Sequence, residues 1–307
     1  MRKTWGTLNT LMGRRNGTDY SKIDKINVNN DTVEDTKGIA NAFNNFFANI
    51  GNDTSNMIPS VTKSYKSYLQ NPSIESFFIE PVNELELLDI ITKLKCKKSS
   101  GSDGISSKLL KICAPYLVIP LSHIINLSFT TGKIPDKMKQ AKVIPVHKAG
   151  NPAELSNYRP ISLLPTFSKV LERAMYNKLF KFLESYNILY KHQYGFRAKH
   201  STIHPLIHLL NHIATSYNEK EKKITIGLFC DLSKAFDVIN HEILLYKLNY
   251  YGIRGHAHNW FLDYLTGRSQ FVQIEYEKST NRSITCGVPQ GSILGPLLFH
   301  SVYIRIE

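Results

Sequence analysis

The chain has 307 residues, 42% hydrophobic and 11% aromatic, so it can bury a large core and is too apolar to be disordered. Its four cysteines form no Cys-x-x-Cys pair, which argues against a zinc site or a disulfide framework. No uninterrupted apolar run approaches the ~18 residues of a membrane span, and no signal-peptide pattern follows the basic N-terminus. We therefore expect an intracellular protein, in the nucleus or the cytoplasm, that does not contact a membrane.

The net charge of +13 is concentrated in the middle of the chain. Residues 1–90 carry 9 Lys/Arg and 11 Asp/Glu, residues 91–200 carry 19 and 5, and residues 201–307 carry 10 and 9. The central segment therefore has a net charge of +14. Such a block is typical of proteins that bind a phosphate-rich partner, most often nucleic acid. A basic surface that serves only solubility is the alternative.

The N-terminal part predicts one helix between two polar connectors. Residues 1–37 are rich in Asn and Asp and weakly patterned. Residues 38–51 place apolar side chains at helical spacing and end in Gly51, which predicts an amphipathic helix. Residues 52–75 return to a polar connector. We therefore interpret residues 1–75 as an N-terminal linker that contains this single helix.

A second amphipathic helix is predicted from Pro81. Its apolar face consists of Leu85, Leu88, Ile91 and Leu94. The loop that follows is basic and glycine-rich, and it contains Lys97 and Lys98. It lacks the Gly-x-x-x-x-Gly-Lys-Ser/Thr spacing of a nucleotide-binding P-loop, so we expect a turn near a phosphate backbone.

The middle of the chain predicts further helices and a strand. Residues 106–131 are typical of one or two helices, broken near Pro115 and Pro120 because proline removes a helical hydrogen bond. Residues 142–148 predict a short strand flanked by lysines, and residues 166–185 predict a long helix.

Three histidines recur every fourth residue in a helix predicted at residues 203–216. They are His204, His208 and His212, a spacing that can hold a metal ion. The apolar residues of this helix form the opposite stripe, and no nearby Cys, Asp or Glu completes a ligand set. A polar outer face is therefore the better interpretation, with a metal site as the alternative.

An almost entirely apolar run at residues 224–230 ends at Asp231. Its length and its β-branched residues predict a strand buried on both faces. A carboxylate at the end of such a strand is costly to bury unless a metal or a cation pairs with it. The alternative is an ordinary strand-to-helix turn with a capping Asp. A helix is predicted shortly afterwards, at residues 241–248.

The C-terminal part predicts an antiparallel hairpin. Residues 270–276 alternate between apolar and polar side chains and can pair with residues 283–286 across a five-residue loop, residues 278–282. A turn at residues 287–291 follows, and then a helix from about Ser292.

Four of these segments, in chain order, resemble motifs of one family: the reverse transcriptases of non-long-terminal-repeat (non-LTR) retrotransposons, of the jockey-like kinds found in animals. They are residues 157–162, 194–197, 231–237 and 287–299. Residues 101–105 and 129–135 are similar to the fingers-side extension of these elements. The predicted helix around residues 43–51 resembles the segment between their endonuclease and polymerase domains.

The resemblance implies a right-hand polymerase of the α/β (α+β) class, with fingers of short strands and helices and a palm built on an antiparallel sheet. We accordingly interpret residues 76–127 as a fingers-side N-terminal extension. Residues 128–307 would form the reverse transcriptase domain, with fingers and a partial palm but no thumb.

The implied activity is RNA-directed DNA polymerisation on an RNA template and a DNA primer, with deoxynucleoside triphosphates as substrates. Two magnesium ions catalyse the transfer in this family. Asp231 would be a ligand of both ions, and the backbone carbonyl of Leu232 would be a further oxygen ligand.

Five residues would bind the incoming nucleotide by resemblance. Phe236 would lie under the sugar and exclude a 2′-hydroxyl, with plain core packing as the alternative. Arg159 and, less directly, Lys142 would contact the triphosphate. Gln290 and Gly291 match the turn beside the nascent base pair, where glycine lets the backbone approach closely.

Basic residues of the central segment are expected to line the path of the nucleic acid. The candidates are Lys97, Lys98, Lys148, Arg197 and Lys199.

The family's second palm motif, an aromatic-Ala-Asp-Asp turn, does not occur, since none of the 11 Asp residues follows another. We therefore expect a chain truncated before this motif, from a decayed copy or an incomplete gene model, that binds magnesium weakly and does not polymerise alone. The alternative is a non-catalytic RNA- or DNA-binding module. A group II intron maturase is a third reading, which the sequence does not test.

Overall fold

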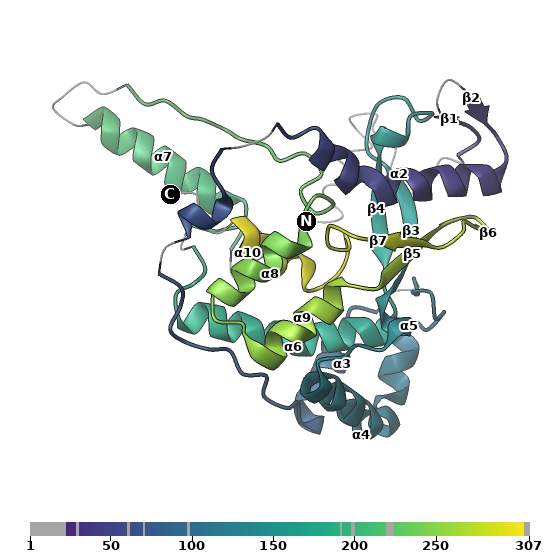
Figure 1. The fold of residues 1–307 in the computed structure, drawn as a ribbon, viewed down its shortest axis with the longest axis horizontal. Coiled ribbons are helices and arrows are strands. Elements are labelled where there is room, and N and C mark those ends of the chain that lie inside the picture. Colours follow the sequence, from purple (N-terminus) through teal and green to yellow (C-terminus); the bar gives the residue numbers. More distant parts are fainter. Residues whose placement is uncertain are drawn as a thin grey trace, which may run out of the picture.

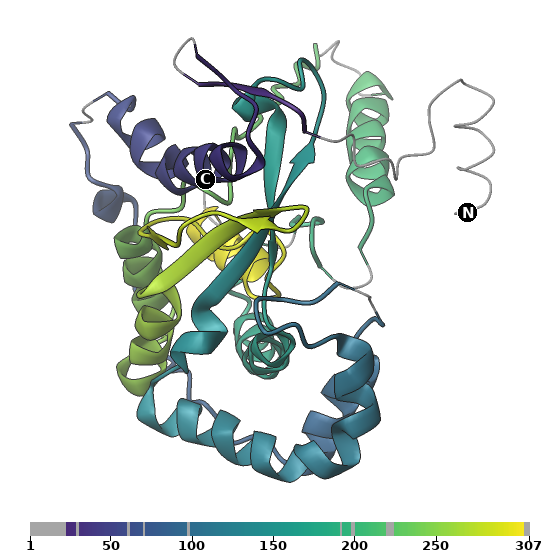
Figure 2. The same cartoon turned by 90° about the vertical axis from the view of Figure 1, so that its right-hand side faces the viewer.

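The computed structural model describes residues 23–28, 31–59, 62–69, 71–96, 99–190, 192–197, 200–218 and 224–303 (Figure 1). Within these residues the chain is a mixed α/β structure. A mixed five-stranded sheet is covered on one face by a long helix, and a larger group of helices packs beside it (Figures 1 and 2).

The sheet joins strands that are far apart in the sequence. Its strands are β3 (Gln140–His147), β4 (Tyr158–Leu163), β5 (Arg268–Ile274), β6 (Glu277–Lys278) and β7 (Arg282–Ile284). β3 pairs with β4 antiparallel and with β5 parallel, and β5 also pairs antiparallel with β6 and β7. The predicted strand at residues 142–148 is thus confirmed and lies inside the sheet. The parallel β3–β5 pair makes the sheet mixed rather than purely antiparallel.

β5 and β7 pair antiparallel as predicted, but the chain between them differs from the prediction. Ile274 pairs with Glu277 across a two-residue turn, so a tight β5–β6 hairpin precedes β7. The predicted five-residue loop is therefore wrong. A distant helix also contacts this part of the chain, since the Asn44 side chain donates to the Thr280 carbonyl at 2.7 Å, in the segment between β6 and β7.

Helix α2 (Thr36–Asn56) lies against the sheet and covers one face (Figure 2). It contains the helix predicted at residues 38–51, extended at both ends, and the Asp35 side chain caps its start by accepting from the Gly38 N–H. Phe43 is fully buried and meets Tyr158 of β4 edge to face, with ring centroids 4.8 Å apart. The short strands β1 (Ile26–Val28) and β2 (Asp31–Val33) pair beside this layer.

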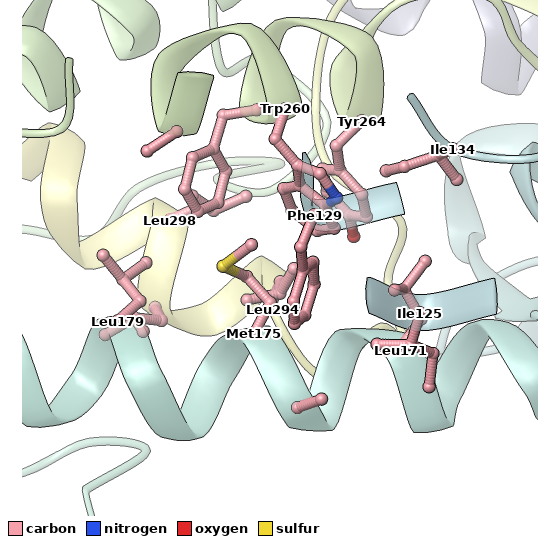
Figure 3. Close-up of a cluster of buried hydrophobic side chains, with 14 of the residues drawn as sticks. Ile125, Phe129, Ile134, Leu171, Met175, Leu179, Trp260, Tyr264, Leu294 and Leu298 are labelled. Atoms are coloured by element: carbon pink, nitrogen blue, oxygen red, sulfur yellow. The ribbon is translucent and has the colours of Figure 1, made fainter. Parts of the chain in front are cut away.

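The larger core forms where six helices meet (Figure 3). They are α3 (Glu84–Lys93), α4 (Ser107–Thr131), α6 (Thr166–Ser185), α8 (His241–Tyr250), α9 (Gly255–Leu265) and α10 (Gly295–Tyr303). The short helices η1 (Tyr65–Tyr68), α5 (Asp136–Lys139) and η2 (Leu155–Asn157) connect longer elements. The helices predicted at residues 166–185 and 241–248 are confirmed, and α10 begins near the predicted position.

Helix α3 is present, but its predicted apolar face is wrong at one end. Leu87, Ile90 and Ile91 are buried, whereas Leu85 is 79% exposed. Side chains spaced by three residues drift around a helix by about 60° at each step, because a turn contains 3.6 residues. A line of such residues therefore leaves the core face within two or three steps.

Helix α4 runs unbroken through both of its prolines, so the break predicted at Pro115 and Pro120 is wrong. Ala114, Val118 and Leu121 are buried beside the prolines and pack into the core, which favours the helical path on both sides of each proline. By length and composition alone α4 could cross a membrane, and 39% of its most apolar stretch is buried inside the protein. This is weak evidence for a membrane span.

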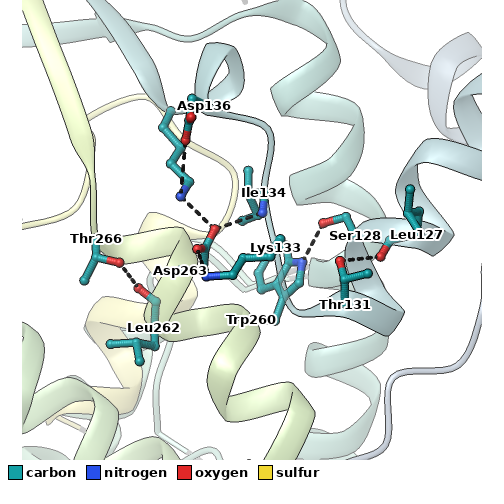
Figure 4. Close-up of polar contacts among 11 residues, drawn as sticks. Leu127, Ser128, Thr131, Lys133, Ile134, Asp136, Trp260, Leu262, Asp263 and Thr266 are labelled. Carbon is teal, nitrogen blue, oxygen red and sulfur yellow. Dashed lines mark hydrogen bonds and ion pairs between the residues drawn. The ribbon is translucent and has the colours of Figure 1, made fainter.

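A buried ion pair ties the chain before β3 to α9 (Figure 4). The carboxylate of Asp263 lies 2.7 Å from Lys139 Nζ and 3.1 Å from Lys133 Nζ, and it accepts the Ile134 N–H at 2.9 Å. Burial raises the pKa of Asp263, but these three hydrogen bonds outweigh it and hold the pKa below its usual value.

Helix α7 (Ile203–Asn218) confirms the helix predicted at residues 203–216, but it projects from the body away from the sheet (Figure 1). His204, His208 and His212 are exposed, as expected for a polar outer face, and the rings of His204 and His208 lie near Tyr194 and His192 of the loop before α7, with centroids 6.3 and 4.8 Å apart. The apolar stripe of this helix is exposed as well, which was not expected. The described residues contain no group of three potential ligands that could hold a metal ion.

Candidate nucleotide-binding site

Two turns from separate motifs lie backbone to backbone. The Val288 N–H donates to the Phe236 carbonyl and the Gly287 N–H donates to the Ile239 carbonyl, both at 2.8 Å. Gly287 has φ +77°, and a Cβ there would lie 2.7 Å from the Asp237 carbonyl oxygen. Only glycine permits this approach. The turn after Asp231 and the turn before α10 therefore form one unit.

The second turn also docks on strand β4. The Ser162 N–H donates to the Gln290 carbonyl at 2.8 Å. Gly291 has φ +123°, and a Cβ would lie 2.6 Å from the Ser162 carbonyl oxygen. The structure thus brings Gln290 and Gly291, two of the predicted nucleotide-binding residues, to β4, and the Val288 N–H joins the Phe236 carbonyl to the same turn.

The two basic candidates Arg159 and Lys142 share one face of the sheet. Arg159 lies opposite Val146 and Lys142 lies opposite Leu163, and directly paired residues project from the same face. The four-residue offset along β3 separates the two positions by about 13 Å. Val143 and Ala141, which alternate with Lys142, are buried in the α2 layer. The two basic residues therefore lie on the face away from α2.

Phe236 is partly buried in an aromatic group. Its ring centroid lies 5.0 Å from that of Phe299 on α10 and 5.9 Å from that of Phe196 in the loop before α7. These contacts agree with the core-packing alternative. Contact with a nucleotide sugar stays a prediction.

Asp237 was given no role by the sequence analysis, yet it lies at the centre of this unit. The Gln290 side chain donates from Nε2 to Asp237 Oδ2 at 2.6 Å. Burial raises the pKa of Asp237 to about 6, against the hydrogen bond from Gln290 and the charge of Lys234, which lower it.

A small cavity of about 40 Å³ opens beside this contact. Its lining includes Phe47 of α2, Ser162 of β4, Arg268 of β5, and Asp237 and Gln290 of the two turns. A single water needs roughly 10–15 Å³ of such volume, so the cavity is large enough for water and too small for a nucleotide.

A second buried carboxylate, Glu172 of α6, holds the far end of the Gln290 turn. Its two oxygens accept the Tyr264 hydroxyl at 2.8 Å and the Ile293 N–H at 2.6 Å. Arg268 donates to the Tyr264 carbonyl at 3.0 Å. Burial raises the pKa of Glu172. The hydrogen bonds from Ile293 and Tyr264 and the charge of Arg268 lower this pKa, but by less than burial raises it. An acidic residue on the buried face of the predicted helix 166–185 was the signal that the sequence offered for this role.

Asp231 and Leu232 do not occupy the predicted buried strand. Residues 224–232 form an unpaired and exposed segment, with Leu228 88% and Leu232 51% exposed. An apolar run with β-branched residues favours a strand, but a buried strand needs neighbours on its edges and faces. The strands of the five-stranded sheet do not pair with this segment. The prediction of a strand buried on both faces is therefore wrong for the described structure.

The described residues do not fit a two-magnesium site. No group of three or more His, Cys, Asp or Glu side chains among them could hold a metal ion, so Asp231 is not part of such a cluster there. Its role as a magnesium ligand stays a prediction, and we derive no catalytic step through the metal.

Two of the five nucleic-acid-binding candidates, Lys148 and Arg197, lie within the described residues, in different loops. Lys148 is exposed just after β3, where its N–H donates to the Asn157 carbonyl at 2.8 Å. Arg197 lies 3.3 Å from Glu184 of α6, so its charge is partly neutralised. Lys97, Lys98 and Lys199 lie outside the described residues.

A comparison with protein families identifies the family of the chain. Residues 146–306 match the family model described as Reverse transcriptase (RNA-dependent DNA polymerase). The chain belongs to the reverse transcriptase family. The match spans β4 and both turns, which are the segments that carry the motifs named from the sequence.

Relatives place this reverse transcriptase among those of non-LTR retrotransposons, as the motifs predicted. The chain is similar to the probable RNA-directed DNA polymerase from transposon BS of Drosophila melanogaster, at 34% identity over 238 residues, which is 75% of the chain and 25% of the relative. It is 32% identical over 244 residues to the RNA-directed DNA polymerase from mobile element jockey of the same species, covering 78% and 26%. The chain spans about a quarter of the length of these relatives.

Proposed function

We propose that the chain belongs to the RNA-directed DNA polymerase domain of a non-LTR retrotransposon, and that by itself it binds an RNA template, a DNA primer and deoxynucleoside triphosphates without catalysing synthesis. The observation that supports this most is the meeting of three motif segments: β4, the turn that contains Phe236 and the turn that contains Gln290. In this proposal residues 76–127 form the fingers-side extension, and residues 128–307 form the fingers and a partial palm. We also propose an intracellular site of action, where these nucleic acids occur.

We assign the residue roles from the motifs. Arg159 and Lys142, on the sheet face away from α2, would contact the triphosphate of the incoming nucleotide. Phe236 would lie beside its sugar. Gln290 and Gly291 would contact the nascent base pair from the turn that docks on β4.

Magnesium is part of the proposal only as a property of the family. Asp231 and the Leu232 carbonyl are the candidate ligands by their motif, and the ion would supply charge stabilisation for phosphoryl transfer. Because the described residues offer Asp231 no cluster of ligands, we expect the chain to bind template and primer without extending the primer.

A non-catalytic nucleic-acid-binding module is the second candidate. The lack of a ligand cluster around Asp231 in the described residues favours it, together with the net charge of +14 in residues 91–200. Both candidates bind nucleic acid through its phosphates, and they differ in the response to a nucleotide.

We expect the chain to bind a fluorescein-labelled RNA template annealed to a DNA primer, with an affinity that falls steeply between 50 and 200 mM salt, by about 10³-fold if six phosphates are contacted. Fluorescence anisotropy measures this. Arg159→Ala should reduce the salt slope by about one only if its guanidinium contacts a nucleic-acid phosphate, whereas Lys63→Ala, in an exposed residue just before η1, should not change it.

The nucleotide distinguishes the two candidates. Addition of the deoxynucleoside triphosphate complementary to the template should tighten the complex for a polymerase domain, and Arg159→Ala should abolish that gain. Tightening by a mismatched nucleotide to the same extent, or no tightening at all, would favour the module. Binding that does not depend on salt would contradict both.

A further inference from the structure

The backbone around Gln290 is fixed on two sides. The Gln290 carbonyl accepts the Ser162 N–H of β4, and Glu172 of α6 accepts the Ile293 N–H three residues later. Gly291 allows the turn to press against β4. The main freedom left at this position is therefore in the Gln290 side chain.

Asp237 restricts that side chain. Its Oδ2 accepts the Gln290 Nε2–H at 2.6 Å. Asp237 is itself held in place, since its N–H donates to the Lys234 carbonyl at 2.8 Å and its carbonyl accepts the Cys286 thiol at 3.5 Å. The carboxylate is thus a fixed acceptor in a partly buried setting.

A carboxylate and an amide are not equivalent partners for Gln290. A glutamine amide has two N–H donors on one end and a carbonyl acceptor on the other. An ionised carboxylate accepts hydrogen bonds only, so it selects the orientation with Nε2 toward Asp237 and Oε1 away from it. A protonated carboxyl or an asparagine can either donate or accept, so it permits both orientations.

We propose that Asp237 is a positioning residue that fixes the orientation of the Gln290 amide and so presents its carbonyl oxygen to the incoming nucleotide. The part about the nucleotide rests on the function proposed above, whereas the part about the amide stands on the contacts alone. The partner of the Gln290 Oε1 acceptor would be an N–H or O–H donor on the sugar or on the base edge of a nucleotide.

The surroundings make Asp237 the group that controls this contact. Lys234 lies on the same turn and favours the ionised form. Arg268 lines the same cavity. Burial raises the pKa of the Cys286 thiol and lowers that of His241, whose Nε2 lies 2.7 Å from the Gly287 carbonyl, so both are neutral at pH 7.5. Above pH 6 the ionised Asp237 carboxylate should therefore hold the Gln290 amide in one orientation. Below pH 6, where the carboxyl is protonated, both orientations should occur.

The amide can be observed directly by NMR in the full chain labelled with side-chain ¹⁵N-glutamine. The chain has six glutamines, and Gln290→Leu identifies the signal of interest by its absence. We expect a shifted, slowly exchanging Gln290 side-chain amide at pH 7.5 that moves with a midpoint near pH 6. Asp237→Leu should give the signal of a free amide, and Asp237→Asn should retain slow exchange but lose the pH response.

A matched control separates positioning from general destabilisation. Asp263→Asn removes another partly buried carboxylate, which is hydrogen-bonded to Lys139 and Ile134 on a different part of the fold. It should lower stability and leave the Gln290 signal unchanged. A Gln290 signal that ignores Asp237→Leu and pH, or that responds equally to Asp263→Asn, would overturn the proposal.

A second measurement concerns the nucleotide. Asp237→Leu should weaken the gain in template–primer affinity caused by the complementary deoxynucleotide about tenfold, which is the effect of one lost hydrogen bond, measured against the same variant without nucleotide. If the unmodified chain shows the NMR behaviour but no nucleotide effect, the proposed function fails and the positioning of the amide stands. An equal nucleotide gain in Asp237→Leu and the unmodified chain would overturn the link to the nucleotide.

Discussion

Replacing Trp260 by alanine is expected to lower the free energy of unfolding by about 3–5 kcal/mol. The indole is fully buried at the centre of the helical core (Figure 3). It stacks on Tyr264 with ring centroids 5.6 Å apart and meets Phe129 edge to face at 6.1 Å. Its Nε1–H also donates to the Ser128 hydroxyl at 3.1 Å. Truncation would open a cavity and remove a buried hydrogen bond, and both effects destabilise the same core.

Urea unfolding followed by circular dichroism measures this loss. Tyr116→Ala is the matched control, because Tyr116 is an aromatic residue of α4 that is 85% exposed. Its effect should stay within about 0.5 kcal/mol. A loss below about 1 kcal/mol for Trp260→Ala would show that the helices do not share one well-packed core.

Gly291→Ala is expected to displace the Gln290 turn from β4, at a cost of at least 2–3 kcal/mol to the docked arrangement. Two effects add at this position. The backbone angle φ of +123° is one that side chains other than glycine rarely adopt, and the new Cβ would lie 2.6 Å from the Ser162 carbonyl oxygen. The hydrogen bond from the Ser162 N–H to the Gln290 carbonyl should be lost with the displacement.

Hydrogen exchange of the Ser162 amide, read by mass spectrometry or NMR, reports the docking directly. Gly255→Ala separates the two effects, because Gly255 has φ +56° and a Cβ there would meet no atom within 4 Å. That variant should cost about 1–2 kcal/mol from the backbone angle alone and leave the Ser162 amide protected. Unchanged protection in Gly291→Ala would mean that the turn does not need its glycine.

The sequence predicted helices well wherever the apolar period was regular. The segments at residues 38–51, 166–185 and 241–248 form helices close to the expected bounds, because local spacing determines which face is buried. Predictions from local sequence failed where contacts between distant segments determine the structure. The core packing around Pro115 keeps α4 unbroken, and Asn44 of α2 contacts the chain between β6 and β7.

The site was predictable only in part. Resemblance to motifs identified Gln290, Gly291 and Arg159, but nothing in their spacing shows that β4 and the Gln290 turn meet, since Ser162 and Gln290 are 128 positions apart. Asp237 was missed because an acidic side chain is expected to be solvated until its burial is known, whereas the position of Glu172 on the apolar face of the predicted helix 166–185 was a signal that went unused. The apolar run before Asp231 failed as a strand because its pairing depends on neighbours that its own residues do not specify.

The central claim is that the described residues form a nucleotide-binding arrangement without a complete magnesium site. Primer extension on a poly(rA) template with an oligo(dT) primer, thymidine triphosphate and magnesium tests it most directly. We expect the chain to bind this template and primer and to show no synthesis above background, with Asp231→Ala indistinguishable from the unmodified chain. Magnesium-dependent synthesis that Asp231→Ala abolishes would contradict the account.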